Sequence, residues 1–150
     1  NNKCAIFYND KDRRFFIECL KKSKDKTNSK IYAYCLMKNH VHLLIEPSRE
    51  DGLAEMMQSL GRRYVQYVNS TYKRTGTLWE GRYRSSLVDK DEYLIACSRY
   101  IEMNPVRAKI VKYPYEYHWS SFKAKAEGKT EDLLDSKPAN LKGFEEWLST

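Results

Sequence analysis

Two of the three histidines in this sequence, His40 and His42, are separated by a single valine. If this segment is a β-strand, side chains two residues apart point to the same face, with Cα atoms about 6–7 Å apart. Two imidazoles in that arrangement can bind one metal ion, since neutral imidazole is a common ligand for divalent metals. A pair of polar residues on a half-exposed hairpin fits the same pattern, because a His-x-His spacing alone is a weak motif.

A second set of side chains follows helical spacing. Steps of four, three and four residues separate Tyr93, Cys97, Tyr100 and Asn104, and such steps place side chains on one face of a helix. Core packing is the alternative for each, since a tyrosine on an amphipathic helix usually packs into a core. We expect core packing for Tyr93, whereas the pattern leaves the role of Tyr100 open.

A tyrosine beside a divalent metal ion could cleave a nucleic acid backbone. The phenol has a pKa of about 10 and is a weak nucleophile at neutral pH. A metal ion that polarises a phosphodiester would stabilise the charge that develops during attack. The product would be a covalent phosphotyrosine. Metal ligands, a tyrosine and a basic surface all occur in this chain, and their combination is more specific than any one of them.

Positive charge is concentrated in the middle of the chain. The net charge is +7, and residues 60–125 alone carry 13 Lys and Arg against 6 Asp and Glu. Arginine suits phosphate oxygens, and neighbouring aromatic rings can stack on unpaired bases. A solvated basic face without a partner remains the alternative. The candidate contacts to DNA phosphates are Arg62, Arg63, Arg82, Arg84, Arg99 and Arg107.

Hydrophobic periodicity predicts the elements that position these residues. Two strands joined by a tight turn lie among helices, which favours an α+β fold. We expect helices at residues 10–24, 53–73, 89–103, 105–111 and 141–148, and strands at residues 31–37, 40–46 and 83–88.

The length and composition limit the class of protein. A chain of 150 residues that is 41% hydrophobic can form one domain with a core. No apolar run approaches the ~20 residues of a membrane-spanning helix. The four cysteines are scattered, without a Cys-x-x-Cys pair, which argues against a zinc knuckle and fits a reducing compartment. We therefore expect a soluble protein of the cytoplasm.

Four segments resemble a known family in their order and spacing. They are residues 32–47 (YAYCLMKNHVHLLIEP), 76–84 (GTLWEGRYR), 100–108 (YIEMNPVRA) and 113–122 (YPYEYHWSSF). The first resembles the HUH (His-hydrophobic-His) motif of the single-tyrosine transposases. Together they resemble the REP-associated tyrosine transposases, relatives of the insertion-sequence-200 type, over roughly residues 1–122.

The resemblance implies a ferredoxin-like antiparallel sheet with packed helices, the HUH endonuclease fold. It also implies cleavage and rejoining of single-stranded DNA beside palindromic hairpins. On this view His40, His42 and Asn104 bind Mg²⁺ or Mn²⁺, although related enzymes have a Gln at the position of Asn104. Tyr100 becomes the nucleophile that takes the 5′-phosphate and leaves a free 3′-hydroxyl.

The resemblance also raises expectations about the limits of the chain. Family members usually begin with a strand that precedes the position of Asn1 and lies beside the HUH strand. We therefore expect that the first strand is missing from this sequence, which would leave an unpaired edge. We assign residues 1–125 to the HUH domain and residues 126–150 to a C-terminal extension packed on it.

The predicted function is that of a metal-dependent tyrosine transposase acting on single-stranded or hairpin DNA in the bacterial cytoplasm, at the nucleoid. Membrane association is not expected, and both a homodimer and a monomer are compatible with the sequence. One alternative is a domesticated protein that binds hairpin DNA without cutting it. Another is a metal-dependent nuclease that uses water, with Tyr100 in a structural role.

Overall fold

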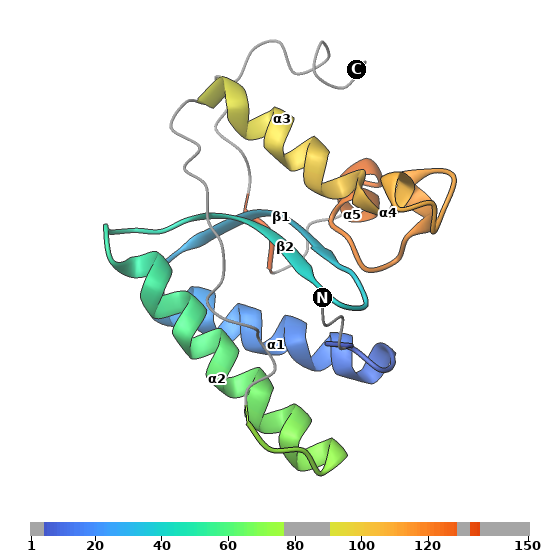
Figure 1. The fold of residues 1–150 in the computed structure, drawn as a ribbon. Helices are drawn as coiled ribbons and strands as arrows, with labels where there is room; N and C mark the ends of the chain where they lie inside the picture. Colours follow the sequence, from blue (N-terminus) through green and yellow to red (C-terminus); the bar gives the residue numbers. More distant parts are fainter. Residues whose placement is uncertain (1–4, 77–90, 129–132, 136–150) are drawn as a thin grey trace. The chain divides into compact units, whose positions relative to one another are not determined.

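The computed structural model describes residues 5–76, 91–128 and 133–135, and the chain forms two compact units (Figure 1). The first unit contains two long helices, and the second contains the sheet and the shorter helices. The first unit is made of Asn1–Lys30, Lys38–His40 and Glu46–Ser85, and the second of Ile31–Met37, Val41–Ile45 and Ser86–Thr150.

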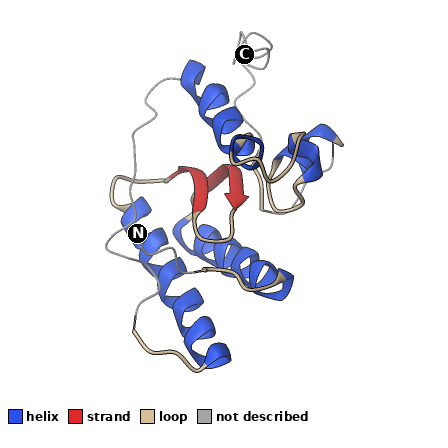
Figure 2. Ribbon diagram, turned by 45° about the vertical axis from the view of Figure 1, so that its right-hand side comes forward, coloured by secondary structure: helices blue, strands red, loops and turns tan. Residues whose placement is uncertain are grey.

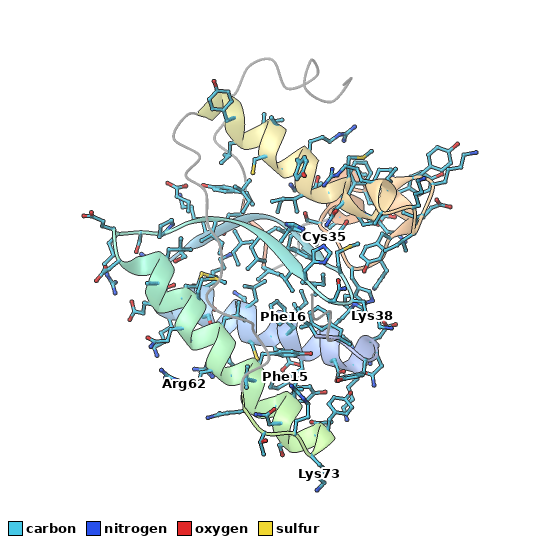
Figure 3. The ribbon with its side chains drawn as sticks, in the orientation of Figure 1. Phe15, Phe16, Cys35, Lys38, Arg62 and Lys73 are labelled. Atoms are coloured by element: carbon cyan, nitrogen blue, oxygen red, sulfur yellow. The ribbon has the colours of Figure 1, made fainter. Side chains whose placement is uncertain are left out.

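In the first unit, helices α1 (Asp10–Thr27) and α2 (Gly52–Tyr72) pack side by side and antiparallel. Phe15 stacks on Tyr67 with ring centroids 4.2 Å apart, and Figure 3 shows Phe15 between the two helices. Farther along α1, the Ser23 hydroxyl donates to that of Ser59 over 3.2 Å. Later residues of α1 therefore contact earlier residues of α2, as expected for antiparallel helices. These aromatic contacts explain why both helices were predictable from their apolar spacing.

A buried carboxylate links the start of α1 to the end of α2. Asp12 is fully buried, and its oxygens accept hydrogen bonds from the Tyr8 backbone N–H and from the Tyr67 and Tyr72 hydroxyls. Asn9 caps α1, since its side-chain oxygen accepts from the Asp12 N–H over 3.0 Å. Buried carboxylates need such donors to offset the loss of hydration. The network thus fixes the start of α1 against the end of α2.

Helix α1 runs three residues beyond the predicted end at residue 24. Thr27 is buried, and its hydroxyl donates to the Ser23 carbonyl over 2.8 Å. The helix ends at Asn28, which takes the left-handed conformation with φ 54°. Asparagine tolerates this conformation better than most residues and closes helices in this way. The polar segment that looked like a loop therefore supplies a last helical turn and its cap.

In the second unit, strands β1 (Lys30–Leu36) and β2 (Val41–Glu46) form an antiparallel pair, drawn in red in Figure 2. The prediction of a β-hairpin is confirmed, although its loop spans four residues rather than two. This unit also contains the helices α3 (Asp91–Glu102), α4 (Asn104–Arg107) and α5 (Phe122–Ala126), with a 3₁₀ helix η1 (Pro114–Glu116) before α5.

The other edge of β1 is paired with a segment that the sequence pattern did not reveal. Cys35 and Ser120 form an antiparallel bridge. The Leu36 N–H donates to the Trp119 carbonyl over 2.9 Å, and the Ser121 N–H donates to the Tyr34 carbonyl over 3.0 Å. These bonds satisfy backbone groups of β1, which would otherwise be costly to bury.

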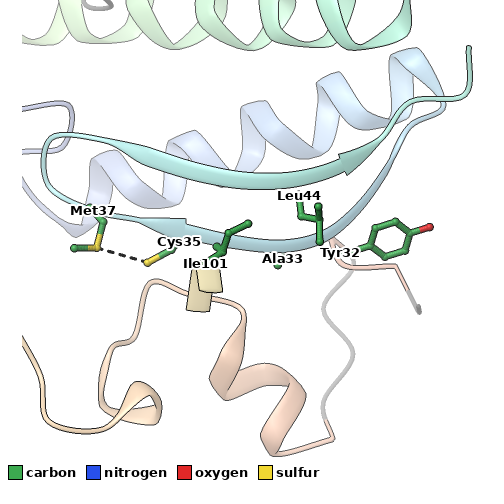
Figure 4. Close-up of a cluster of buried hydrophobic side chains, with 6 residues drawn as sticks. All are labelled: Tyr32, Ala33, Cys35, Met37, Leu44 and Ile101. Atoms are coloured by element: carbon green, nitrogen blue, oxygen red, sulfur yellow. Dashed lines mark hydrogen bonds between the residues drawn. The ribbon is translucent and has the colours of Figure 1, made fainter. Parts of the chain in front are cut away.

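The core of the second unit lies between the sheet and α3. Figure 4 shows its buried cluster, in which Ile101 of α3 meets strand residues and the Cys35 thiol donates to the Met37 sulfur over 3.6 Å. Leu94 and Cys97 of α3 and Tyr117 pack against this cluster. The full cluster is Tyr32, Ala33, Cys35, Met37, Leu44 and Ile101. Burial of one stripe of α3 fixes which of its residues face outward.

The prediction of an α+β fold with an antiparallel sheet and packed helices is confirmed. The predicted strand at residues 83–88 and the helix at residues 141–148 lie outside the described residues. The division into residues 1–125 and 126–150 stays a prediction. No helix in the described part of the chain combines the length and the apolar character needed to cross a membrane.

Candidate active site

Tyr100 lies in the last turn of α3 with its side chain 60% exposed. Its neighbours Ser98, Ile101 and Glu102 are buried. Since residues about three and four apart share a helix face, this burial turns Tyr100 away from the core. An exposed phenol at a helix end can reach a ligand from solvent. The alternative that Tyr100 packs into the core is therefore wrong.

Arg107 connects Tyr100 and Asn104. Its guanidinium carbon lies 3.7 Å from the centroid of the Tyr100 ring, which is a cation–π contact. One guanidinium nitrogen donates to the Tyr100 carbonyl over 2.8 Å, and another to the Asn104 side-chain oxygen over 3.4 Å. The structure thus brings three of the predicted site residues together.

These three residues lie at the junction of two helices. Helix α3 ends at Glu102, and α4 begins at Asn104 with Pro105 in its first turn, where a missing N–H costs nothing. The N-cap position of α4 is Met103. The Asn104 side chain is thereby available to Arg107, three residues later on α4.

Of the predicted face of Tyr93, Cys97, Tyr100 and Asn104, the first three residues lie in one helix, α3, and Asn104 begins α4. Cys97 is half-buried against the core, where burial raises the pKa of its thiol. Tyr93 is 45% exposed, so it is not the core residue that we expected. The predicted boundary, with helices ending at residue 103 and starting again at residue 105, is close to the observed one.

A buried ion pair holds the end of α3 that carries Tyr100. The Glu102 carboxylate is 95% buried and lies 2.8 Å from the Lys125 ammonium group of α5. It also accepts a hydrogen bond from the Ser121 hydroxyl, and Lys125 donates to the Ser98 hydroxyl over 2.8 Å. Because a buried charge needs partners from well-defined positions, this network fixes α3 against α5 and Ser121.

The two histidines flank the start of β2. His40 precedes the strand and is exposed, whereas His42 is its second residue and is half-buried. His40 Nδ1 lies 2.8 Å from the Asn39 side-chain oxygen. In the neutral tautomer with its proton on Nδ1, the ring donates to that oxygen and keeps the lone pair of Nε2 for a metal ion. Metal-binding histidines commonly have this arrangement.

The donor types at these positions suit a divalent cation. Imidazole and amide oxygen together are compatible with Mn²⁺ and Mg²⁺. Within the described residues, His, Cys, Asp and Glu side chains form no cluster of three or more that could hold a metal. The assignment of His40, His42 and Asn104 as ligands of a metal ion stays a prediction. The Asn104 oxygen would first have to exchange its hydrogen bond with Arg107.

The other predicted DNA contacts lie in different surroundings. Arg62 and Arg63 are exposed on α2, and Figure 3 shows Arg62 on the outer side of that helix. Arg99 is half-buried, with its guanidinium carbon 5.4 Å from the Phe122 ring centroid. The positions of Arg82 and Arg84 lie outside the described residues. The six assignments as DNA contacts stay predictions.

Sequence reasoning missed a pair of exposed tyrosines near the site. Tyr113 and Tyr115, on either side of Pro114, have nearly parallel rings with centroids 5.6 Å apart. The available signal was the alternation of aromatic residues around a proline within a basic segment. That spacing does not predict a helix or a strand, so the periodicity analysis gave these residues no role.

Comparison with known families and proteins gave two matches. The family model described as "Transposase IS200 like" matches residues 1–104, more than half of the chain. A curated protein of Haemophilus influenzae, named "Putative REP-associated tyrosine transposase", is 27% identical over 124 residues, which cover 74% of this chain and 70% of that protein. No solved structure gives a significant match to the chain. The chain belongs to the family of IS200-like transposases, enzymes that act on DNA.

Proposed function

We propose that this protein cleaves and rejoins single-stranded DNA next to hairpin sequences through a covalent bond between DNA and Tyr100. The observation that carries the proposal is the exposed Tyr100 ring with the Arg107 guanidinium 3.7 Å from its centroid. A phosphodiester that approaches the Tyr100 hydroxyl would thereby come close to a fixed positive charge. A purely structural tyrosine would need neither this exposure nor this cation.

The chemistry conserves the energy of the phosphodiester bond. The Tyr100 hydroxyl oxygen attacks phosphorus and loses its proton, while the bond to the 3′-oxygen breaks and that oxygen takes up a proton. The products are a 5′-phosphotyrosine and a free 3′-hydroxyl. In the reverse step, a 3′-hydroxyl oxygen attacks the phosphotyrosine, the bond between phosphorus and the Tyr100 oxygen breaks, and Tyr100 takes up a proton. DNA is thereby rejoined without an external energy source.

Two kinds of side chain would assist this step. Arg107 has five N–H donors, of which two serve the Tyr100 carbonyl and Asn104; the remaining donors can bind the phosphate. His40, His42 and Asn104 would hold Mg²⁺ or Mn²⁺. Such an ion withdraws charge from the non-bridging phosphate oxygens.

The substrate and the setting of the reaction follow from the same proposal. Exposed Arg62 and Arg63 would bind DNA phosphates, with Arg82, Arg84 and Arg99 as further contacts. We propose single-stranded or hairpin DNA as the partner, in the bacterial cytoplasm at the nucleoid. The chain could act as a monomer or as a homodimer.

A denaturing gel tests the proposal. The protein is incubated with single-stranded hairpin DNA, labelled on the side that would carry the 5′-phosphate, in Mn²⁺ or in chelator. A labelled band at the size of the protein, formed only with Mn²⁺, supports covalent capture by Tyr100. Cleaved DNA without a protein-linked band would instead indicate hydrolysis by water, and binding without cleavage would indicate a DNA-binding protein that has lost catalysis.

A further inference from the structure

The segment between α4 and α5 exposes an unusual amount of aromatic surface. Tyr113 is 45% exposed and Tyr115 is 56% exposed, and their ring planes are 9° apart. Ile110, in the same segment, is 56% exposed. Large hydrophobic side chains exposed close together mark binding surfaces, and three are exposed within this short stretch of the chain.

This segment is held in place rather than loosely attached. The Glu116 carboxylate accepts hydrogen bonds from the backbone N–H groups of Lys112 and Tyr113, over 3.0 and 2.8 Å. The Tyr117 hydroxyl donates to the Leu36 carbonyl over 2.7 Å, and the Tyr117 ring packs against the core cluster. The two exposed rings are therefore presented by a fixed backbone, which reduces the entropy that a ligand must offset.

Positive charge accompanies the exposed rings. The Lys112 ammonium group lies 5.5 Å from the centroid of the Tyr113 ring. Arg107 and Lys109 are exposed in the same segment. Flat aromatic faces beside cations suit nucleobases attached to a phosphate backbone. An apolar protein partner would gain little from this charge.

We infer that Tyr113 and Tyr115 form a stacking site for unpaired bases of single-stranded DNA, with Lys112 as a contact to the adjoining phosphate. The inference rests on the proposed function, since it takes the DNA substrate from it and adds the place where unpaired bases are held. Duplex DNA offers no exposed base faces in its interior. The stacking site therefore distinguishes the unpaired flank of a hairpin from its stem.

Binding assays with matched variants test the inference. Fluorescence anisotropy of labelled oligothymidylate, and of a blunt duplex, is measured in chelator with the full chain. The variant Tyr113→Leu/Tyr115→Leu removes both rings, and Tyr113→Phe/Tyr115→Phe keeps them. Tyr8→Leu is the control, because Tyr8 is also exposed and also contacts another tyrosine ring, that of Tyr72.

The leucine variant should bind oligothymidylate at least about tenfold more weakly, since stacking on an aromatic side chain contributes roughly 1–3 kcal/mol per base. Its duplex affinity and the affinities of the phenylalanine and Tyr8→Leu variants should stay within about twofold of the wild type. Lys112→Gln should lower the slope of affinity against salt by about 0.7 for single strands. A strand containing 2-aminopurine should lose fluorescence on binding to the wild type but not to the leucine variant.

Two results would overturn the inference. One is unchanged single-strand affinity in the leucine variant, and the other is an equal loss of single-strand and duplex affinity with no recovery in the phenylalanine variant. The proposed function is judged separately by the covalent adduct. Adduct formation with normal binding by the leucine variant refutes only the stacking site, whereas ring-dependent binding without any adduct refutes only the phosphotyrosine mechanism.

Discussion

The Arg107 guanidinium lies over the Tyr100 ring, 3.7 Å from its centroid, and donates a hydrogen bond to the Tyr100 carbonyl. The two residues belong to successive helices, Tyr100 to the last turn of α3 and Arg107 to α4. A cation held at this place can bind the phosphate that Tyr100 would attack. The relationship therefore connects the local fold to the proposed chemistry.

The first prediction concerns this contact. Arg107→Lys keeps the charge but loses the planar fork that bridges the Tyr100 carbonyl and Asn104. We expect covalent adduct formation to slow at least about tenfold, because hydrogen bonds from charged groups contribute about 1.5–3 kcal/mol. DNA affinity should change far less. Single-turnover adduct assays and anisotropy measure the two quantities.

Arg49→Lys is the matched control for Arg107→Lys. Arg49 is an exposed arginine of the first unit that pairs with Asp51 and Glu55. Its replacement should leave the adduct rate unchanged. If Arg107→Lys also reacts at the wild-type rate, the guanidinium does not assist Tyr100.

Metal binding provides the second prediction. His42→Ala should lower the affinity for Mn²⁺, measured by calorimetry, at least about tenfold, and should remove adduct formation. Asn104→Ala should have a smaller effect on Mn²⁺ affinity, since its oxygen already accepts from Arg107. His118→Ala is the control, because His118 is exposed and lies against Trp119. Wild-type Mn²⁺ affinity in His42→Ala would exclude His42 as a ligand.

The third prediction concerns the stability of the helix that carries Tyr100. Glu102→Ala should lower the free energy of unfolding by about 3–5 kcal/mol, because it leaves the partly buried Lys125 ammonium group without its buried partner. Replacing both residues, as in Glu102→Leu/Lys125→Met, should recover most of that loss. Chemical denaturation monitored by circular dichroism measures the difference.

The exposed pair of Lys21 and Asp25 on α1 serves as the comparison for the buried pair. Asp25→Ala should change the free energy of unfolding by less than about 1 kcal/mol, as exposed ion pairs contribute little. A similarly small effect of Glu102→Ala would mean that the buried pair does not fix α3.

The fourth prediction is a loss of stability at alkaline pH. Burial raises the pKa of the Cys19 thiol to about 11. Burial and the hydrogen bonds to Asp12 raise the pKa of Tyr67 and of Tyr72 to about 12. Between the unfolded and folded pKa values the folded chain binds more protons, so the free energy of unfolding falls as the pH rises. The fall should begin near pH 9 and continue to about pH 12.

Cys19→Ala separates the two contributions to this alkaline loss. The wild-type thiol should account for about 2 kcal/mol between about pH 9 and 11, and the variant should lack that part of the slope. The tyrosine part, above about pH 10, should remain in Cys19→Ala and weaken in Tyr72→Phe. Parallel pH profiles for wild type and Cys19→Ala would contradict the assignment to the thiol.

The parts of the fold that sequence alone could predict are those with a repeated pattern. Apolar residues at helical spacing located α1 and α2, and two short apolar runs joined by a turn located β1 and β2. Residues 119–121 were missed as a partner of β1, because a short bridge carries no periodicity. Its position depends on contacts far apart along the chain, such as the Tyr34 backbone with Ser121.

In the candidate site, too, the sequence predicted the residues better than the contacts between them. Residue type and resemblance suggested Tyr100, Asn104 and Arg107 separately, and the predicted helix boundary near residue 103 agrees with the observed one. The contact among the three depends on the side-chain conformation of Arg107, which the sequence pattern does not specify. In the structure the guanidinium lies over the Tyr100 ring and donates to the Asn104 oxygen.

The most direct test of the account is the identity of the residue that becomes linked to DNA. Trypsin cuts after Arg99 and after Arg107, which releases a peptide of residues 100–107 with Tyr100 as its single tyrosine. After incubation with hairpin DNA and Mn²⁺ and digestion with nuclease, mass spectrometry should find a nucleotide phosphate on this tyrosine, and Tyr100→Phe should form no adduct. An adduct on another residue, or one that persists in Tyr100→Phe, would contradict the central claim.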